Sequence, residues 1–441
     1  MKKIFILIIF FLLTNCSFDE NSGIWENQNL SKEQEDLFKE FEKISISRDS
    51  FKKVINLDKN FSFKLTKTIS NNVWSDIYYK YNNNSENFKY KNNNKVIFKS
   101  KKLSSYKINN FILFYENNLI INDQRGNIIV YSTSQNQIIS KFNFYKKKFK
   151  NIKKQLNFII KDDIIYTADN IGYLYAYSIK TKKLIWAKNY KVPFRSNLKI
   201  IKNIIIASNQ DNDLFFFNKK DGTLLNKFPT EQNVVKNQFV NNISTNGTDT
   251  VFFINSYGSI YSIDLNKANI NWFTNLNKSI DYNPSNLFLG NQIVNNNDKV
   301  IISSNTNTYL FDKNSGSIEN IFNFSSILKP IINKNFVFTV TNNNYLVAVD
   351  LSSKKILYSS DIDSQIANYL DVKKKSTAIK DFLLINNEIM IFLENSYLIK
   401  FEINGKLKEV RKLPSKMVTH PIIINKTVMF IDNKNRLNIL D

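Results

Sequence analysis

Short runs of alternating hydrophobic and polar residues, separated by turn-forming residues, extend over most of the chain. One example begins with DIIYTA (163–168), turns at 169–172, continues with YLYAY (173–177), turns at 178–183 and ends with LIWA (184–187). A period of two is typical of β-strands with one buried face, and glycine or asparagine favours tight turns between antiparallel strands. The pattern therefore predicts an all-β chain built from antiparallel meanders.

This pattern occurs eight times between residue 126 and residue 441. Aligned on the turn residue, the copies begin at Gly126, Gly172, Asn212, Gly258, Thr306, Asn344, Ser396 and Asn435. Their spacing runs from 38 residues (Thr306 to Asn344) to 52 residues (Asn344 to Ser396), which brackets the length of about 40 to 50 residues of a four-stranded propeller blade. We therefore predict an eight-bladed β-propeller of four-stranded antiparallel blades.

Two further positions recur in phase with the turn residue. The residue six places after each start is polar: Ser132, Ser178, Asn218, Asp264, Asp312, Asp350, Glu402 or Asp441. These residues predict turns rather than paired carboxylates, because equivalent positions on different blades are separated around a ring. Trp186, Trp272 and Tyr358 all follow their turn residue by fourteen places. We expect these rings to pack between neighbouring blades; a ligand-stacking platform is the alternative.

The last copy is one strand short. It provides only 421–424, 428–432 and 437–440 before the chain reaches Asp441. The segment VIFK (96–99), which precedes the first complete blade at Phe111, can supply the missing strand. Closure of the ring by an N-terminal and a C-terminal strand would remove free sheet edges.

The first residues have the pattern of an export signal. Lys2 and Lys3 precede an apolar run (4–13) that is shorter than the roughly 20 residues of a membrane-spanning helix. Cys16, the only cysteine of the chain, lies just after this run. We predict a lipoprotein signal peptide over 1–15 and lipidation of Cys16, with a stray cysteine as the alternative. By resemblance to Gram-negative lipoproteins, Ser17 indicates the periplasmic face of the outer membrane.

Residues 16–61 show no strand pattern and are expected to form a tether before a propeller at 62–441. The sequence SKEQ (31–34) resembles a capping box, and Leu37, Phe38, Phe41 and Ile44 would share one face of a short helix. This helix could dock on the propeller or act as a spacer.

The chain is strongly basic, with 61 Lys and Arg against 38 Asp and Glu and a formal net charge of +23. The lysines are scattered through loops, and export argues against a nucleic-acid partner. We attribute the charge to a compositional bias toward Asn, Lys, Ile and Phe; a functional attraction to anionic lipid or to an acidic partner is the alternative.

Catalytic motifs are not found. His420 is the only histidine, and a zinc-type site would need several converging His, Cys or carboxylate ligands. The sequence also contains no nucleophile elbow and no glycine-rich phosphate loop. We therefore predict no catalytic residue, no metal and no cofactor, and expect His420 to serve in packing or at the surface.

The repeats GYLYAYSIKTKKLIW, GSIYSIDLNKANINW and NYLVAVDLSSKKILY resemble the pyrroloquinoline-quinone-type propeller repeat. This repeat occurs in quinoprotein dehydrogenases and in the outer-membrane protein assembly factor family BamB. The dehydrogenases of this type bring calcium ligands and commonly a disulfide between adjacent cysteines, which a chain with one cysteine cannot form. The export signal, tether, eight blades and terminal-strand closure together resemble the BamB family.

The resemblance implies a non-catalytic scaffold that acts as a monomer within a complex. It would bind the periplasmic POTRA domains of a BamA-type insertase and assist unfolded outer-membrane proteins. The family's apolar-Arg contact resembles VPFRS (192–196), so Phe194 and Arg195 are the candidate partner-binding residues. The family's second contact loop usually carries acidic residues, whereas FVNNI (239–243) has none. A lipid-anchored quinoprotein-like enzyme or a ligand-binding propeller is the alternative.

Overall fold

The computed structural model describes residues 16–18, 25–27, 51–145, 149–232, 240–276, 288, 290, 292–304, 306–326 and 328–441. The chain divides into two compact units, Met1–Ser50 and Phe51–Asp441. In the first unit, β1 (Cys16–Phe18) pairs with β2 (Trp25–Asn27) in antiparallel orientation. The expected signal peptide (1–15) and the expected short helix after residue 31 lie outside the described residues.

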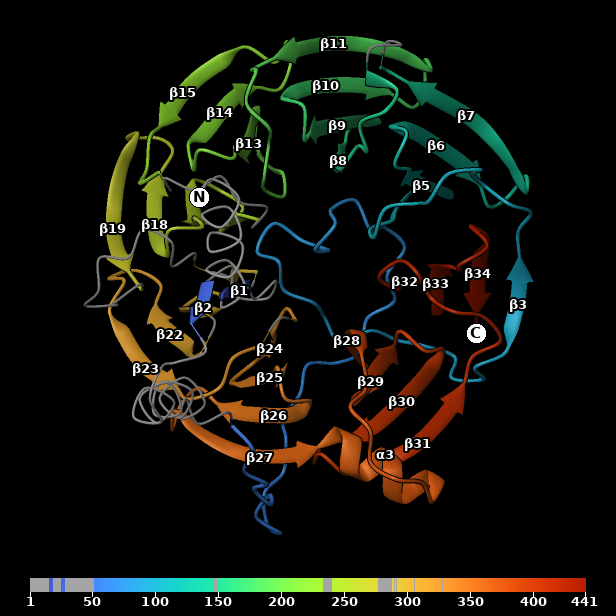
Figure 1. Cartoon of the computed structure of the whole chain (residues 1–441), viewed down its shortest axis with the longest axis vertical. Helices are drawn as coiled ribbons and strands as arrows, with labels where there is room; N and C mark the ends of the chain where they lie inside the picture. Colours follow the sequence, from blue (N-terminus) through green and yellow to red (C-terminus); the bar gives the residue numbers. More distant parts are fainter. Residues whose placement is uncertain are drawn as a thin grey trace, which may run out of the picture. The chain divides into compact units, whose positions relative to one another are not determined.

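The described residues of the second unit form eight four-stranded antiparallel sheets, arranged as a ring (Figure 1). The predicted all-β fold of an eight-bladed propeller is therefore confirmed. Blades 1 to 4 consist of β4 (Leu113–Tyr115), β5 (Asn118–Asn122), β6 (Asn127–Ser132) and β7 (Gln137–Asn143); β8 (Leu156–Lys161), β9 (Ile164–Asp169), β10 (Tyr173–Ser178) and β11 (Lys183–Asn189); β12 (Lys199–Ile201), β13 (Ile204–Ser208), β14 (Leu214–Asn218) and β15 (Leu224–Phe228); and β16 (Asn242–Thr245), β17 (Thr250–Ile254), β18 (Ser259–Asp264) and β19 (Asn269–Asn275).

Blades 5 to 8 follow the same plan, except that the last blade takes one strand from the N-terminal side. They consist of β20 (Val294–Asn295), β21 (Lys299–Ser303), β22 (Thr308–Asp312) and β23 (Ile318–Phe322); β24 (Ile331–Asn333), β25 (Phe336–Val340), β26 (Tyr345–Asp350) and β27 (Lys355–Asp361); β28 (Ile379–Ile385), β29 (Glu388–Leu393), β30 (Tyr397–Glu402) and β31 (Leu407–Lys412); and β32 (Ile422–Ile424), β33 (Thr427–Ile431), β34 (Leu437–Leu440) and β3 (Val96–Lys99). Strand β3 pairs with β34, Val96 opposite Leu440, which confirms the predicted closure.

Backbone conformation explains the choice of turn residues. Seven of the eight predicted turn residues have a positive φ, which glycine and asparagine adopt most easily: Gly126, Gly172, Asn212, Gly258, Asn344, Ser396 and Asn435. The exception is the β-branched Thr306, whose N–H is instead held by the Ser304 hydroxyl. The recurring polar residues also close turns, as expected: the Asp312 carboxylate accepts from the N–H groups of Asn314 and Ser315.

The recurring aromatic residues pack between blades, as predicted. Each ring lies against a glycine in the outer hairpin of the next blade, where φ is positive and a side chain would collide with the ring. A Cβ atom at Gly316 would lie only 2.3 Å from the Trp272 ring. The Trp272 ring also stacks on Phe311 of that blade, with centroids 5.9 Å apart. The three pairs are Trp186 with Gly222, Trp272 with Gly316 and Tyr358 with Gly405.

The chain before β3 crosses the inside of the ring, where the sequence shows no strand pattern (Figure 1). We call residues 69–88 the channel belt. Its two ends meet, because Ile69 and Phe88 form a parallel bridge. Between them the belt reaches the innermost strand of every blade, or the turn after it, in spatial order. These contacts are Asn71 with Asn425 (blade 8), Trp74 with Phe114, Ser75 with Ile160, Asp76 with Lys199, Tyr81 with Thr245, Asn82 with Asn295, Asn84 with Ile332 and Phe88 with Leu384.

The belt supplies hydrogen-bond partners to the backbone groups at sheet edges that would otherwise face the channel unpaired. Its asparagine side chains contribute directly: the Asn83 amide donates to Ile243 O at 2.9 Å and to Ile293 O at 2.8 Å. Asp76 and Lys199 form a buried ion pair with 2.6 Å between Oδ2 and Nζ. The belt therefore links all eight blades from within.

Helix α3 (Ile362–Leu370) lies in the connection between blades 6 and 7. Its N-cap is Asp361, whose carboxylate accepts from the N–H of Ser364, and Asp371 ends it in a left-handed conformation. Among the described residues, no helix combines the length and apolar character required to cross a membrane.

Candidate functional site

The connection between β11 and β12 carries the two residues expected at a partner interface, Phe194 and Arg195. Neighbouring segments hold its backbone. The N–H of Phe194 donates to Asp169 O at 3.0 Å, and the N–H of Arg195 donates to Ser208 O at 2.8 Å. Pro193 O accepts from the N–H of Gln210 at 2.7 Å. The loop is therefore fixed on strands of blades 2 and 3.

The Phe194 side chain, which the resemblance predicts to bind the partner, is buried in the structure. It is only 2% accessible and belongs to the core between blades 2 and 3. Its ring lies 6.2 Å from that of Tyr190 and 6.1 Å from that of Phe217, measured between centroids. The backbone at Phe194 is extended and forms a bridge with Asn209. Neighbouring side chains of an extended segment point to opposite sides, so Phe194 points into the core and Arg195 points away from it. Phe194 therefore supports the loop and is not an exposed anchor.

Arg195 lies where three blades meet. Its side chain is partly exposed, and Nη1 donates to Gln155 Oε1 in the segment before blade 2 at 3.3 Å. Its carbonyl accepts from the N–H of Asn241, just before blade 4, at 2.7 Å. Within the described part of the chain, Nε has no hydrogen-bond acceptor. Burial lowers the pKa of Arg195, but a guanidinium remains charged at neutral pH. Because Nε is itself buried, the donors left for an external acceptor are those of the Nη atoms.

The segment at the place of the family's second contact loop (239–243), which lacks the family's acidic residues, begins outside the described residues at Phe239. Asn241, Asn242 and Ile243 are buried, whereas Val240 is 47% exposed. Val240 directly precedes Asn241, which bonds to the Arg195 backbone. An exposed apolar side chain beside an arginine is a typical composition for a protein interface. The sequence did not single out Val240, because exposure cannot be read from its residue type.

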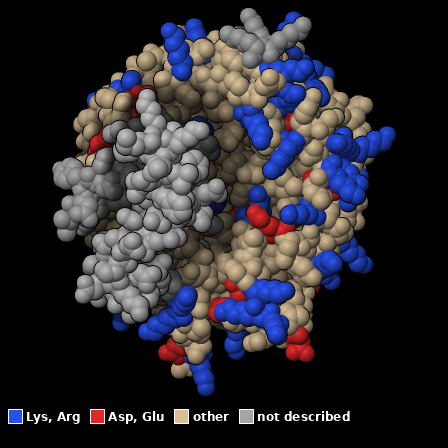
Figure 2. Space-filling model, in the orientation of Figure 1, with Lys and Arg blue, Asp and Glu red and all other residues tan. Residues whose placement is uncertain are grey.

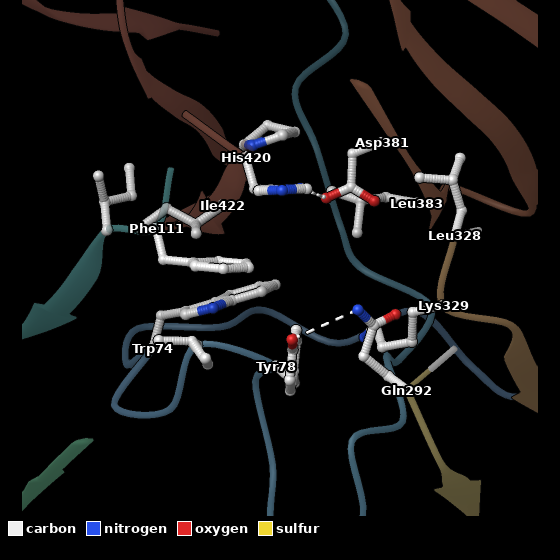
Figure 3. A pocket seen from close by; sticks show the side chains of 13 residues that line it. Trp74, Tyr78, Phe111, Gln292, Leu328, Lys329, Asp381, Leu383, His420 and Ile422 are labelled. Atoms are coloured by element: carbon white, nitrogen blue, oxygen red, sulfur yellow. Dashed lines mark hydrogen bonds and ion pairs between the residues drawn. The ribbon is translucent and has the colours of Figure 1, made fainter. Parts of the chain in front are cut away.

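A second candidate site, the central pocket, lies at the ring centre (Figure 3). The belt contributes Trp74, Ile77 and Tyr78, and the segments that begin blades 5 to 8 and blade 1 contribute the rest. The remaining lining residues are Phe111, Ile112, Gln292, Leu328, Lys329, Asp381, Leu383, His420, Pro421 and Ile422. The cavity measures about 70 Å³. The described surface is hollowed at the ring centre, and Lys and Arg side chains are spread over the face rather than gathered in one stripe (Figure 2).

His420 lies in the wall of this pocket. Its ring stacks on Phe111 with a centroid separation of 4.7 Å and an interplanar angle of 7°, so the expected packing role is confirmed. In addition, Nδ1 lies 2.9 Å from Oδ2 of Asp381. Sequence reasoning missed this pair and Lys329 beside it, because the residues stand at the start of three different blades and share no local motif.

The central pocket does not fit the quinone and calcium of the dehydrogenases that share this repeat. Trp74 and Tyr78 of the belt occupy the ring centre, and the remaining cavity is far below the roughly 300 to 1,000 Å³ of ordinary ligand pockets. Among the described residues, no group of three or more His, Cys, Asp or Glu could hold a metal ion. The single cysteine cannot form a disulfide with an adjacent cysteine.

Solved structures with the same fold include both assembly factors and enzymes. BamB from Moraxella catarrhalis matches with a TM-score of 0.62 and 12% identity over 79% of this chain and 99% of its own. Quinohemoprotein alcohol dehydrogenase from Comamonas testosteroni matches with a TM-score of 0.63 and 9% identity over 83% of this chain and 80% of its own. The computationally designed protein Ika8 matches with a TM-score of 0.59 and 11% identity over 78% of this chain and 99% of its own. At these identities the likeness establishes the fold alone.

The sequence comparison is more specific than the fold. No curated protein matches the chain in sequence. Residues 124–360, more than half of the chain, match the family described as outer membrane protein assembly factor BamB. The matched residues run from the third strand of blade 1 to the fourth strand of blade 6, and so include Phe194 and Arg195. The chain therefore belongs to the BamB family of outer membrane protein assembly factors.

Proposed function

We propose that this protein is a non-catalytic scaffold lipoprotein of the outer-membrane β-barrel assembly machinery. It binds the periplasmic POTRA domains of a BamA-type insertase and assists the insertion of outer-membrane proteins. Family membership supports this assignment, and the geometry around Arg195 supports the choice of specific residues for the partner surface.

The proposed partner surface consists of Arg195, Gln155 and Val240. Arg195 offers the charge-assisted donors of its Nη atoms to a carboxylate or carbonyl of the partner, and Val240 offers apolar area next to it. Because neighbouring strands hold the loop backbone at Arg195, little loop ordering is needed on binding.

The N-terminal residues provide the membrane anchor in this proposal. Residues 1–15 act as a lipoprotein signal peptide, Cys16 carries the lipid, and residues 16–61 form the tether that precedes the propeller at 62–441. Several acyl chains, at about 0.8 kcal/mol for each buried CH₂, would hold a monomeric propeller permanently at the periplasmic face of the outer membrane.

Co-purification tests the proposal. Gentle detergent extraction of the tagged, full-length protein should bring a BamA-type insertase with it. A bound chromophore or calcium in place of the insertase would instead support the enzyme alternative. Cys16→Ser should release the protein from the membrane fraction; a Cys16→Ser protein that stays in that fraction would contradict lipidation at this residue.

Charge reversal locates the interface. We expect Arg195→Glu to reduce insertase capture by at least about tenfold. The change replaces a hydrogen-bond donor at the protein contact with a carboxylate, which the partner's carboxylate or carbonyl oxygen would repel. Lys183→Glu is the matched control, since it makes the same charge change at an exposed position of β11 in the same region. Equal capture by both variants would remove Arg195 from the interface.

A further inference from the structure

The central pocket contains a partly buried ammonium group, that of Lys329, which forms no ion pair among the described residues. Lys329 Nζ donates to the Ser85 hydroxyl at 2.6 Å. Within the described part of the chain, no carboxylate forms an ion pair with it. Burial lowers the pKa of Lys329 to about 8, so the amine is still mostly protonated at pH 7. A buried cation is costly unless an anion compensates it.

A second donor faces the same cavity. The Tyr78 hydroxyl accepts from Gln292 Nε2 at 3.3 Å (Figure 3). Its own hydrogen has no acceptor among the described residues. Burial raises the pKa of Tyr78 to about 12, so the hydroxyl keeps its proton at neutral pH. Lys329 and Tyr78 therefore both have hydrogen-bond donors to spare.

The carboxylate that lines the pocket is already committed. Oδ2 of Asp381 pairs with His420 Nδ1 at 2.9 Å, and Oδ1 accepts from the N–H of Phe382 at 2.8 Å. Asp381 is thus held by two partners of its own and forms no ion pair with Lys329, although it lies near enough for its charge to favour the protonated amine. Lys329 and Tyr78 supply the donors left over at the pocket, and an anionic acceptor is the chemical class that would satisfy them.

The rest of the pocket limits the size and shape of this anion. Phe111, Leu328 and Ile422 form an apolar wall, and the Phe111 ring is fixed by its stacking on His420. A cavity of about 70 Å³ accommodates a molecule of only a few heavy atoms. One unpaired ammonium balances one negative charge. We infer that the central pocket is a binding site for a short-chain monocarboxylate, whose carboxylate accepts from Lys329 and Tyr78 while its alkyl end contacts the apolar wall.

This inference is separate from partner binding, because the pocket and the Arg195 surface share no residue. Ligand-detected NMR with butyrate and the purified full-length protein tests it, with butyramide as the uncharged probe of equal size. We expect saturable butyrate binding and at least about tenfold weaker butyramide binding, since a hydrogen bond between two charged groups is stronger than one in which the acceptor is neutral.

Two variants locate the site. Lys329→Met should weaken butyrate binding by at least about tenfold, and Tyr78→Phe, which keeps the ring in place, by about threefold or more. Lys416→Met, at an exposed position in the connection before blade 8, is the control and should bind as the parent does. If Lys329→Met does not fold, Tyr78→Phe alone decides. Absent butyrate binding, equal binding of butyramide, or full affinity in Tyr78→Phe would overturn the inference.

Discussion

The blades and the channel belt both pair backbone N–H and C=O groups at strand edges, but their partners lie at different distances along the sequence. Within a blade, each strand pairs with one that follows it after a short turn, as β9 pairs with β10. In the belt, the partners lie far away in sequence: the Asn83 amide bonds to Ile243, 160 residues on, and that of Asn71 to Ile423, 352 residues on. Local pairing leaves a repeating pattern in the sequence, whereas the belt does not.

The belt can form only when the ring is complete. Its partners come from all eight blades, so its hydrogen bonds can form only after distant parts of the chain have come together. Each blade, in contrast, contains its own hairpins. We therefore expect changes in the belt to weaken the ring as a whole, and changes in hairpins to act through one inter-blade contact.

The largest effect is expected from breaking the buried ion pair of the belt. Asp76→Ala leaves the Lys199 ammonium, whose side chain is only 1% exposed, without its counterion. We predict a loss of about 3 to 5 kcal/mol in the free energy of unfolding, measured by urea denaturation. Asp162→Ala is the matched control: Asp162 pairs with Lys219 at 2.8 Å but is 63% exposed, so less than about 1 kcal/mol should be lost. Similar losses in both variants would contradict the special role of the belt.

The next effect tests the contact between blades. Gly316→Ala places a Cβ atom 2.3 Å from the Trp272 ring at a φ of +70°. Overpacking and a left-handed backbone together should cost about 2 to 4 kcal/mol. At Gly247, φ is +85° but the nearest atom, in the Tyr81 ring, lies 3.2 Å away, so Gly247→Ala should cost only about 1 to 2 kcal/mol. Equal costs would show that the Trp272 contact is not tight.

A smaller effect is expected from one belt asparagine. The Asn84 side chain donates to Ile332 O at 2.8 Å and accepts from the N–H of Ile332 at 2.9 Å. Asn84→Ala removes both bonds and should cost about 1 to 3 kcal/mol in urea denaturation. Asn395→Ala, at an exposed position, should change stability by no more than about 0.5 kcal/mol. An Asn84→Ala protein as stable as the parent would show that water replaces these bonds.

The smallest effect concerns pH. Burial lowers the pKa of Lys329 to about 8, below the value of about 10.4 in an unfolded chain. Between these values the unfolded chain binds more protons, so this residue makes stability rise with pH from about 8 to 10.4. Asp381, Asp76, Lys199, Tyr78 and His420 surround the amine and share its field.

The measurement is the stability difference between the parent and Lys329→Met. This difference should shift in favour of the parent by less than about 1.4 kcal/mol per pH unit above pH 8, because the amine is partly accessible to solvent. A difference that does not change with pH would place the pKa of Lys329 outside this window.

The ring was predictable from the sequence because its determinants are local. Turn residues such as Gly172, the polar position at Asp312 and the aromatic at Trp272 all recur at fixed spacing. Even the closing strand β3 could be placed, because the last repeat lacked one strand. A propeller repeats the same local sequence pattern, so a blade whose pattern is weak can still be identified from its spacing to the other copies.

The candidate sites were less predictable. Arg195 was found through its resemblance to a family contact, but the sequence alone did not show that Phe194 next to it is 2% exposed. Lys329, Asp381 and His420 come from three blades and meet only after the ring closes. Their proximity is a property of the ring and of the belt that fills its centre, and no spacing along the chain encodes it.

Photo-crosslinking in intact cells tests the central claim most directly. A photoreactive amino acid at Val240, which is 47% exposed and adjacent to the Arg195 loop, should trap a POTRA-bearing insertase. The same amino acid at Ile97, which is 53% exposed on β3 of blade 8, should not. A crosslink to the insertase at both positions, or at Ile97 alone, would contradict a partner surface centred on Arg195.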